Sequence, residues 1–214
     1  MVQIQAFTFN PFSENTYLLF NTETKEACLF DPGCSNATEQ ATLKRFLKEK
    51  SLTLTQLLLT HAHIDHILGY SWVHDTYNLT ARANEKEIPV FQRGKESALL
   101  FGISYEEGPK LIADLNHGLV LDIVGEKWEL REAPGHSPGS ILFVCHAKKW
   151  VIAGDVLFRE SIGRSDLPGG NQEALMRSIT RELYSLPDDY TVFPGHGPET
   201  SIGHEKQANP FIRG

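Results

Sequence analysis

The fold is decided by residues 54–70, LTQLLLTHAHIDHILGY, which join a strand to a helix through a loop of potential metal ligands. LTQLLL at 54–59 has the continuous apolar character of a buried strand, and an apolar helical pattern resumes over 66–77. Between them, four side chains of ligand type occur within six residues: His61, His63, Asp65 and His66. In an extended segment the first three project to one side, and the fourth joins them where the chain turns into a helix.

Three later fragments repeat this design, each placing one ligand directly after a glycine. They are APGHSPG with His136, IAGDVLF with Asp155, and FPGHGPET with His196. A glycine lets the backbone approach a crowded site closely. Imidazole and carboxylate without thiolate suit zinc, iron or manganese, and seven ligands are too many for one tetrahedral ion. The set therefore predicts two metal ions, with one carboxylate bridging them.

The remaining pattern predicts two strand-rich halves that each carry helices. Strands are expected at 2–9, 15–20, 27–31, 54–59, 119–123, 127–132, 140–146, 149–154 and 191–193, and helices at 37–49, 66–77, 171–185 and 201–208. Residues 84–118 lean toward helix but are interrupted by prolines and glycines, and this segment is a candidate lid over a site. The arrangement predicts one α/β domain over 1–214, with two packed sheets covered by helices outside.

Composition narrows the partners that this chain is expected to have. The 214 residues carry a net charge of −7 without a basic run, so nucleic acid is not expected to bind. No apolar run is long enough for a membrane span, so no membrane partner is expected. Three cysteines without a CxxC pair favour a reducing compartment, and the chain is expected to be cytoplasmic.

The motifs THAHIDH, APGHSPG, AGDVLF and PGHGPET together resemble the metallo-β-lactamase superfamily, in order and over nearly the whole chain. The resemblance implies a four-layer αββα sandwich of two mixed β-sheets. It also implies a first metal on His61, His63 and His136, a second on Asp65, His66 and His196, and a bridging Asp155. Zn²⁺ is the expected metal, with iron or manganese as alternatives. True β-lactamases of this pattern carry cysteine or histidine at position 155, so antibiotic hydrolysis is not expected.

Within the superfamily, GDVLFRESIGRSDLPGGN and PETSIGHEKQANPF resemble the short bacterial form of the glyoxalase II group. This implies hydrolysis of a glutathione thioester such as S-lactoylglutathione, by attack of a hydroxide that bridges the two metals. Asp65 is the expected catalytic residue because it can orient the hydroxide and pass a proton to the leaving group. Arg164 is the candidate for binding a substrate carboxylate. Asp166 departs from the longer enzymes, which carry a tyrosine there.

Other functions remain open at the level of sequence. GRSDLPGG also resembles a persulfide dioxygenase, which would hold a single iron on His61, His136 and Asp155. A phosphodiesterase or nuclease would suit two metals, but the chain lacks a basic surface. A non-enzymatic metal-stabilised module would need a closed coordination sphere. Four further histidines lie outside the motifs and are expected to serve surface or structural roles: His74, His117, His146 and His204.

Overall fold

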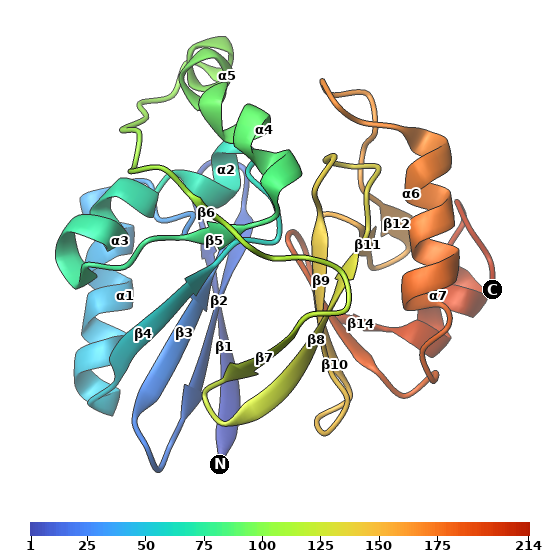
Figure 1. Cartoon of the computed structure of the whole chain (residues 1–214), viewed down its shortest axis with the longest axis horizontal. Helices are drawn as coiled ribbons and strands as arrows, with labels where there is room; N and C mark the ends of the chain where they lie inside the picture. The colour runs from blue at the N-terminus through green and yellow to red at the C-terminus, as the bar shows by residue number, and fades with distance from the viewer.

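The computed structural model describes residues 1–214 and builds them around two six-stranded sheets packed against each other. The first sheet contains, in spatial order, β1 (Val2–Phe9), β2 (Glu14–Asn21), β3 (Glu26–Phe30), β4 (Thr53–Leu58), β5 (Arg82–Ala83) and β6 (Ile112–Ala113). Pairing is antiparallel from β1 to β3 and parallel from β3 to β6, so the sheet is mixed. In Figure 1 the parallel strands β3 and β4 run upward and end below the short helices at the top of the view.

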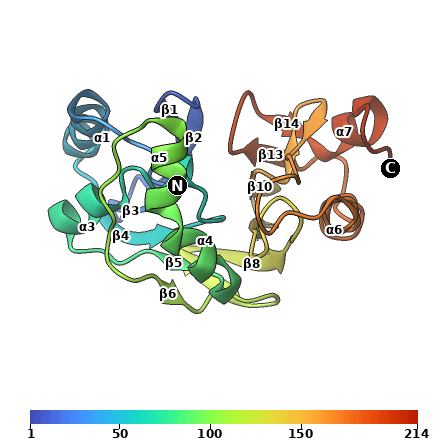
Figure 2. The same cartoon turned by 90° about the horizontal axis from the view of Figure 1, so that it is seen from above.

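The second sheet is also mixed, in the order β14-β13-β10-β9-β8-β7. Its strands are β7 (Val120–Ile123), β8 (Glu126–Glu132), β9 (Ile141–Cys145), β10 (Trp150–Gly154), β13 (Thr191–Pro194) and β14 (Thr200–Ser201). Only β10 and β13 pair in parallel. A short hairpin of β11 (Leu157–Phe158) and β12 (Ser161–Ile162) follows β10. Seen from above, the two sheets stand side by side (Figure 2).

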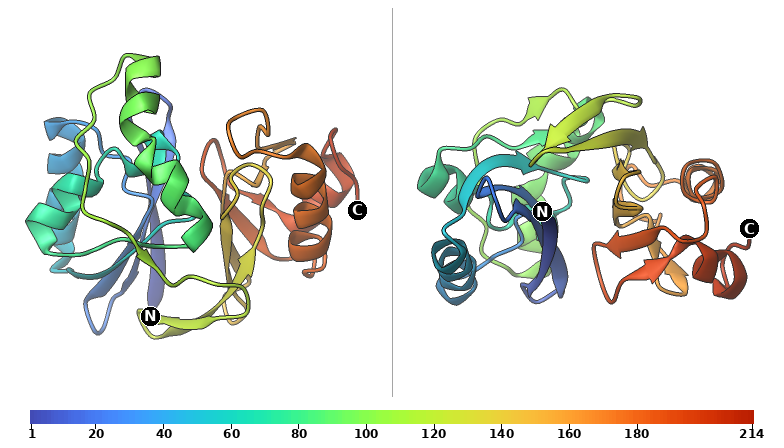
Figure 3. Two further views of the ribbon diagram at one scale, coloured as in Figure 1. Left: turned by 45° about the horizontal axis from the view of Figure 1, so that its top comes forward. Right: turned by 90° about the horizontal axis from the view of Figure 1, so that it is seen from below.

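Helices cover the outer face of each sheet, and several short ones lie over the strand ends, as Figures 1 and 3 show. They are α1 (Ala37–Lys50), α2 (Ile64–Ile67), α3 (Tyr70–Tyr77), the 3-10 turn η1 (Glu85–Glu87), α4 (Ile88–Gln92), α5 (Gly94–Phe101), α6 (Gln172–Ser178), the π-helical η2 (Ile179–Leu183) and α7 (Ile202–Ala208). The Asn36 side chain caps α1 by accepting hydrogen bonds from the Thr38 and Glu39 amides, and Ser51 ends it in the left-handed conformation with φ 54°. None of these helices is long and apolar enough to cross a membrane.

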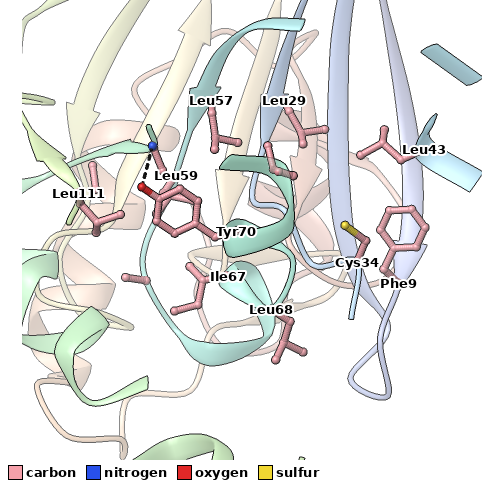
Figure 4. Close-up of a cluster of buried hydrophobic side chains, with 14 of the residues drawn as sticks. Phe9, Leu29, Cys34, Leu43, Leu57, Leu59, Ile67, Leu68, Tyr70 and Leu111 are labelled. Atoms are coloured by element: carbon pink, nitrogen blue, oxygen red, sulfur yellow. Dashed lines mark hydrogen bonds between the residues drawn. The ribbon is translucent and has the colours of Figure 1, made fainter. Parts of the chain in front are cut away.

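Alternation along the strands divides the apolar side chains among three cores. On β2, Leu18 packs under the helices of the first sheet, whereas Leu19 packs between the sheets. On β9, Phe143 faces the intersheet core, and Leu142 faces α6. Figure 4 shows the first of these cores, where the Tyr70 hydroxyl accepts a hydrogen bond from the Ala81 amide at 3.1 Å. The predicted four-layer αββα sandwich is therefore confirmed.

Two predicted helices are divided, for identifiable reasons. The helix expected over 66–77 breaks between α2 and α3, where the Gly69 amide donates to the Pro32 carbonyl at 2.7 Å. A Cβ at Gly69 would lie 2.5 Å from the Cys34 sulfur, so only glycine lets this turn pack against the end of the first sheet. The helix expected over 171–185 leaves α-geometry after Ser178 and continues as the π-helical η2.

The three cysteines are free and buried.

Candidate metal centre

Loops that follow strands bring all seven predicted ligand side chains to one place. The loop after β4 supplies His61 and His63, and α2 directly after it supplies Asp65 and His66. The β8–β9 loop, the end of β10 and the end of β13 supply one each. Possible ligand atoms of His61, His63 and His136 lie within 4.8 Å of one another, and so do those of Asp65, His66 and His196. These are the two triplets that the family resemblance implies. Their role as metal ligands stays a prediction.

Asp155 lies between the two triplets. Its Oδ1 is 3.4 Å from His66 Nε2, and its Oδ2 is 3.4 Å from His136 Nε2. The same Oδ2 is 3.4 Å from His196 Nε2. A single carboxylate thus faces nitrogens of both groups, which is the position that a carboxylate needs in order to bridge two cations.

Unpartnered buried atoms show that the site fits cations. His61 Nε2, His66 Nε2 and Asp155 Oδ1 are all buried without a hydrogen-bond partner. A buried polar atom left unsatisfied costs about 1–3 kcal/mol of stability, and a cation bound between these three atoms would remove that cost. Burial lowers the pKa of His61 well below its usual range and lowers the pKa of His63 to about 3, so both imidazoles have lone pairs free to bind a cation.

Hydrogen bonds on the far side of three imidazoles orient them toward the centre. His136 Nδ1 donates to the Arg164 carbonyl at 2.8 Å, and His196 Nδ1 donates to the Phe12 carbonyl at 3.1 Å. Because a carbonyl only accepts, Nδ1 carries the proton in both rings when they are neutral, and Nε2 presents its lone pair to the site. His66 Nδ1 makes the equivalent contact with a buried carboxylate that none of the sequence motifs indicates.

That carboxylate is Asp31, at the end of β3. Its Oδ2 lies 3.1 Å from His66 Nδ1, and its two oxygens accept from the Thr60 amide at 2.7 Å and the Thr60 hydroxyl at 2.6 Å. Asp31 is 1% exposed. Asp31 closes the apolar segment 27–31 directly before Pro32, and this local pattern predicts the end of a strand but not a contact with His66.

Glu87 is a second functional candidate that the sequence did not reveal. Its Oε2 accepts from the Ala62 amide at 2.8 Å, while Oε1 accepts from the Ser137 hydroxyl and the Gly139 amide, both at 2.6 Å. The carboxylate therefore ties the loop of His61 and His63 to the loop of His136. Burial raises the pKa of Glu87, and the three hydrogen bonds lower it in part. Its segment, 84–118, gave no pattern that pointed to this contact.

A cavity of about 800 Å³ opens over the centre. One of its walls comes from α4 and α5, and the opposite wall runs from β12 to Pro168. Part of the segment 84–118 thus borders the site, from Val90 to Phe101, and its role as a lid stays a prediction. Arg164 also lines the cavity, and its guanidinium binds Asp166 through two hydrogen bonds of 2.7 and 2.8 Å.

The four histidines set aside from the motifs do not line this cavity. His74 contacts the Leu79 carbonyl, and His117 accepts from the Glu132 amide. The other two sit in surface pairs, His146 with Glu129 and His204 with Glu160. Their structural contacts agree with the roles expected from sequence.

Two packed sheets with a cluster of histidines and aspartates at their strand ends are the arrangement of the metallo-hydrolase fold. The chain belongs to the metallo-β-lactamase superfamily, whose sequence profile matches residues 9–196. It is 36% identical to the hydroxyacylglutathione hydrolase GloC of Haemophilus influenzae, over 99% of this chain and 98% of the relative.

Solved structures share the same fold. The crystal structure of BLEG-1 B3 metallo-β-lactamase matches with a TM-score of 0.87 and 35% identity, covering 99% of this chain and 100% of that one. The crystal structure of TTHA1623 in a di-iron-bound form matches with a TM-score of 0.87 and 34% identity, covering 97% of this chain and 100% of that one. These likenesses establish the family and the fold, and the similar proteins include a hydroxyacylglutathione hydrolase, a β-lactamase and a di-iron-bound protein.

Proposed function

We propose that this chain hydrolyses the thioester bond of a glutathione conjugate such as S-lactoylglutathione, with two divalent metal ions. The observation that carries the proposal is the placement of Asp155, whose carboxylate faces nitrogens of both ligand triplets. The likeness to GloC of Haemophilus influenzae over nearly the full length of both chains supports the choice of substrate. The partner is then a small molecule, and the reaction belongs in the cytoplasm.

The ligand set assigns residues to each ion. His61, His63 and His136 would hold one, Asp65, His66 and His196 the other, and Asp155 both. Bound ions of this type lower the pKa of a coordinated water toward about 7 and polarise a carbonyl oxygen. Nitrogen and oxygen ligands accept zinc, iron or manganese, and zinc is our first choice.

The chain's own groups would handle the proton and the substrate. The Asp65 carboxylate lines the cavity, and its Oδ2 is 3.1 Å from His196 Nε2. This carboxylate can accept a proton from the attacking water and deliver it to the departing sulfur, so that thioester and water become a carboxylic acid and a thiol. Arg164 can exchange its exposed partner Asp166 for a substrate carboxylate.

A single-iron persulfide dioxygenase is the principal alternative. It would use His61, His136 and Asp155, which do converge in this structure. Such a centre would leave Asp65, His66 and His196 without a function, although their ligand atoms lie within 4.8 Å of one another. A phosphodiesterase or nuclease is disfavoured because the net charge of −7 would repel an anionic phosphodiester substrate.

The test is metal counting combined with a substrate panel. The purified protein is assayed for cleavage of S-lactoylglutathione, oxygen uptake on glutathione persulfide, and hydrolysis of a cephalosporin and of a phosphodiester. Two metals per chain with thioester cleavage support the proposal. One iron with oxygen uptake selects the dioxygenase, and cephalosporin or phosphodiester cleavage without thioester cleavage overturns the proposed substrate.

A further inference from the structure

The wall formed by the start of α5 carries two charged side chains that no residue of the chain neutralises. Arg93 directly precedes α5, Glu96 lies in its first turn, and both line the cavity over the metal centre. Neither makes an ion pair, and the only hydrogen bond of the Arg93 side chain goes from Nε to the Pro89 carbonyl at 3.3 Å. Arg164, on the opposite wall, already binds Asp166.

Their spacing places these two charges on one face. Residues three and four apart on a helix are neighbours, so Arg93, Glu96 and Ser97 border the same part of the cavity. The wall thus offers a cation, an anion and a hydroxyl together. A free α-amino acid group, with its carboxylate beside its ammonium, is the ligand that matches this pattern of charge.

The wall is also fixed in place, which favours recognition. Gly94 is buried against the Tyr105 ring, where a Cβ would come within 2.8 Å of a ring carbon. At the other end of α5, the Phe101 ring packs edge-on against Phe12 from the β1–β2 turn, with centroids 5.2 Å apart. A binding surface held in advance loses little freedom when a ligand arrives.

We propose that Arg93 and Glu96 bind the free α-carboxylate and α-ammonium at the γ-glutamyl end of a glutathione thioester. Ser97 adds a hydroxyl beside them. The proposal rests on the function proposed above and extends it, because it divides the substrate between the two ends of the cavity. The thioester lies at the metal centre, and the amino acid end lies against α5.

The test compares ligands that differ only in this end. Binding of S-methylglutathione and of S-methyl-N-butanoyl-cysteinylglycine, in which the γ-glutamyl group has lost only its amino and carboxyl groups, is measured by calorimetry on the metal-loaded protein. We expect Arg93→Met to weaken S-methylglutathione binding about tenfold or more, and to leave binding of the butanoyl ligand unchanged. Lys95→Met is the matched control, because Lys95 lies on the same helix outside the cavity and pairs with Glu107.

The role of Glu96 is tested with a ligand whose α-ammonium group has been removed by acetylation. The wild type should prefer S-methylglutathione to its N-acetyl derivative, and Glu96→Gln should remove most of that preference. The proposal is overturned if wild-type protein does not bind S-methylglutathione, if Arg93→Met and Lys95→Met behave alike, or if both ligands lose affinity equally. Binding through Arg93 without thioester cleavage would contradict the proposed hydrolysis only, whereas cleavage unaffected by Arg93→Met would contradict the amino acid site only.

Discussion

Asp31 Oδ2 lies 3.1 Å from His66 Nδ1, on the side of the imidazole that faces away from Asp155. The carboxylate is buried and also accepts two hydrogen bonds from Thr60, so it is held in position independently of the histidine. The pair orients the His66 ring and favours the tautomer that leaves Nε2 free for a metal ion.

Replacing Asp31 by asparagine should therefore weaken metal binding at the triplet that contains His66. Loss of such a supporting contact typically lowers metal affinity about 10- to 100-fold. Competition with a chelator, followed by metal analysis, measures the change. The exposed Asp75→Asn is the control, and equal metal affinity in both variants would argue against this role for Asp31.

Glu87→Gln should loosen the other triplet. Three donors converge on the Glu87 carboxylate, so an amide of the same shape must turn its NH₂ group toward at least one of them. We expect a loss of about 1–3 kcal/mol in the free energy of unfolding of the metal-free protein, with weaker binding of the first metal. Denaturant unfolding and metal titration test both effects. The exposed Glu85→Gln should change neither.

Metal uptake by the metal-free protein should release more protons at one ligand triplet than at the other. Burial would lower the pKa of His196, but hydrogen bonds to Asp155 and Asp65 outweigh it and raise the pKa to about 10. This ring is then protonated at neutral pH, whereas His61 and His63 are not. The triplet of Asp65, His66 and His196 should thus lose apparent metal affinity as pH falls from about 10 toward neutrality, and the first triplet should not.

Calorimetric titrations in buffers of different ionisation enthalpy measure these protons. The expected result is little proton release with the first metal and release with the second. Equal release at both steps would mean that the two triplets do not differ in protonation.

Gly135→Ala should be far more damaging than Gly118→Ala. Gly135 has φ 141°, and a Cβ there would lie 2.2 Å from the Leu175 amide nitrogen, so α6 or the His136 loop must move. Gly118 has φ 78° with open space around it. We expect a loss of about 2–5 kcal/mol at Gly135 from strain and overpacking together, and about 1 kcal/mol at Gly118. Thermal unfolding of the two variants makes the comparison.

The sequence predicted those parts of the centre whose signal is local. His136, Asp155 and His196 each follow a glycine at the end of an apolar segment, and the structure brings them next to the segment from His61 to His66. Asp31 and Glu87 were not identified because their roles depend on distant partners. Asp31 meets a histidine 35 residues away, and Glu87 meets a serine 50 residues away.

Secondary structure was predictable where periodicity was strong and not where it was broken. The intersheet strands alternate or run apolar throughout, and their predicted positions are close to the observed ones. Between 84 and 118, α4 has five residues and α5 has eight, and Pro89, Gly94 and Gly102 interrupt the segment, so its apolar positions show no sustained helical repeat. That segment supplies both Glu87 and the cavity wall.

The most direct test of the central claim is a crystal structure of the metal-loaded protein with anomalous diffraction recorded at the metal edge. The account predicts two peaks, one among His61, His63 and His136 and one among Asp65, His66 and His196, with the Asp155 carboxylate between them. A single peak held by His61, His136 and Asp155, with the second triplet empty, would contradict it.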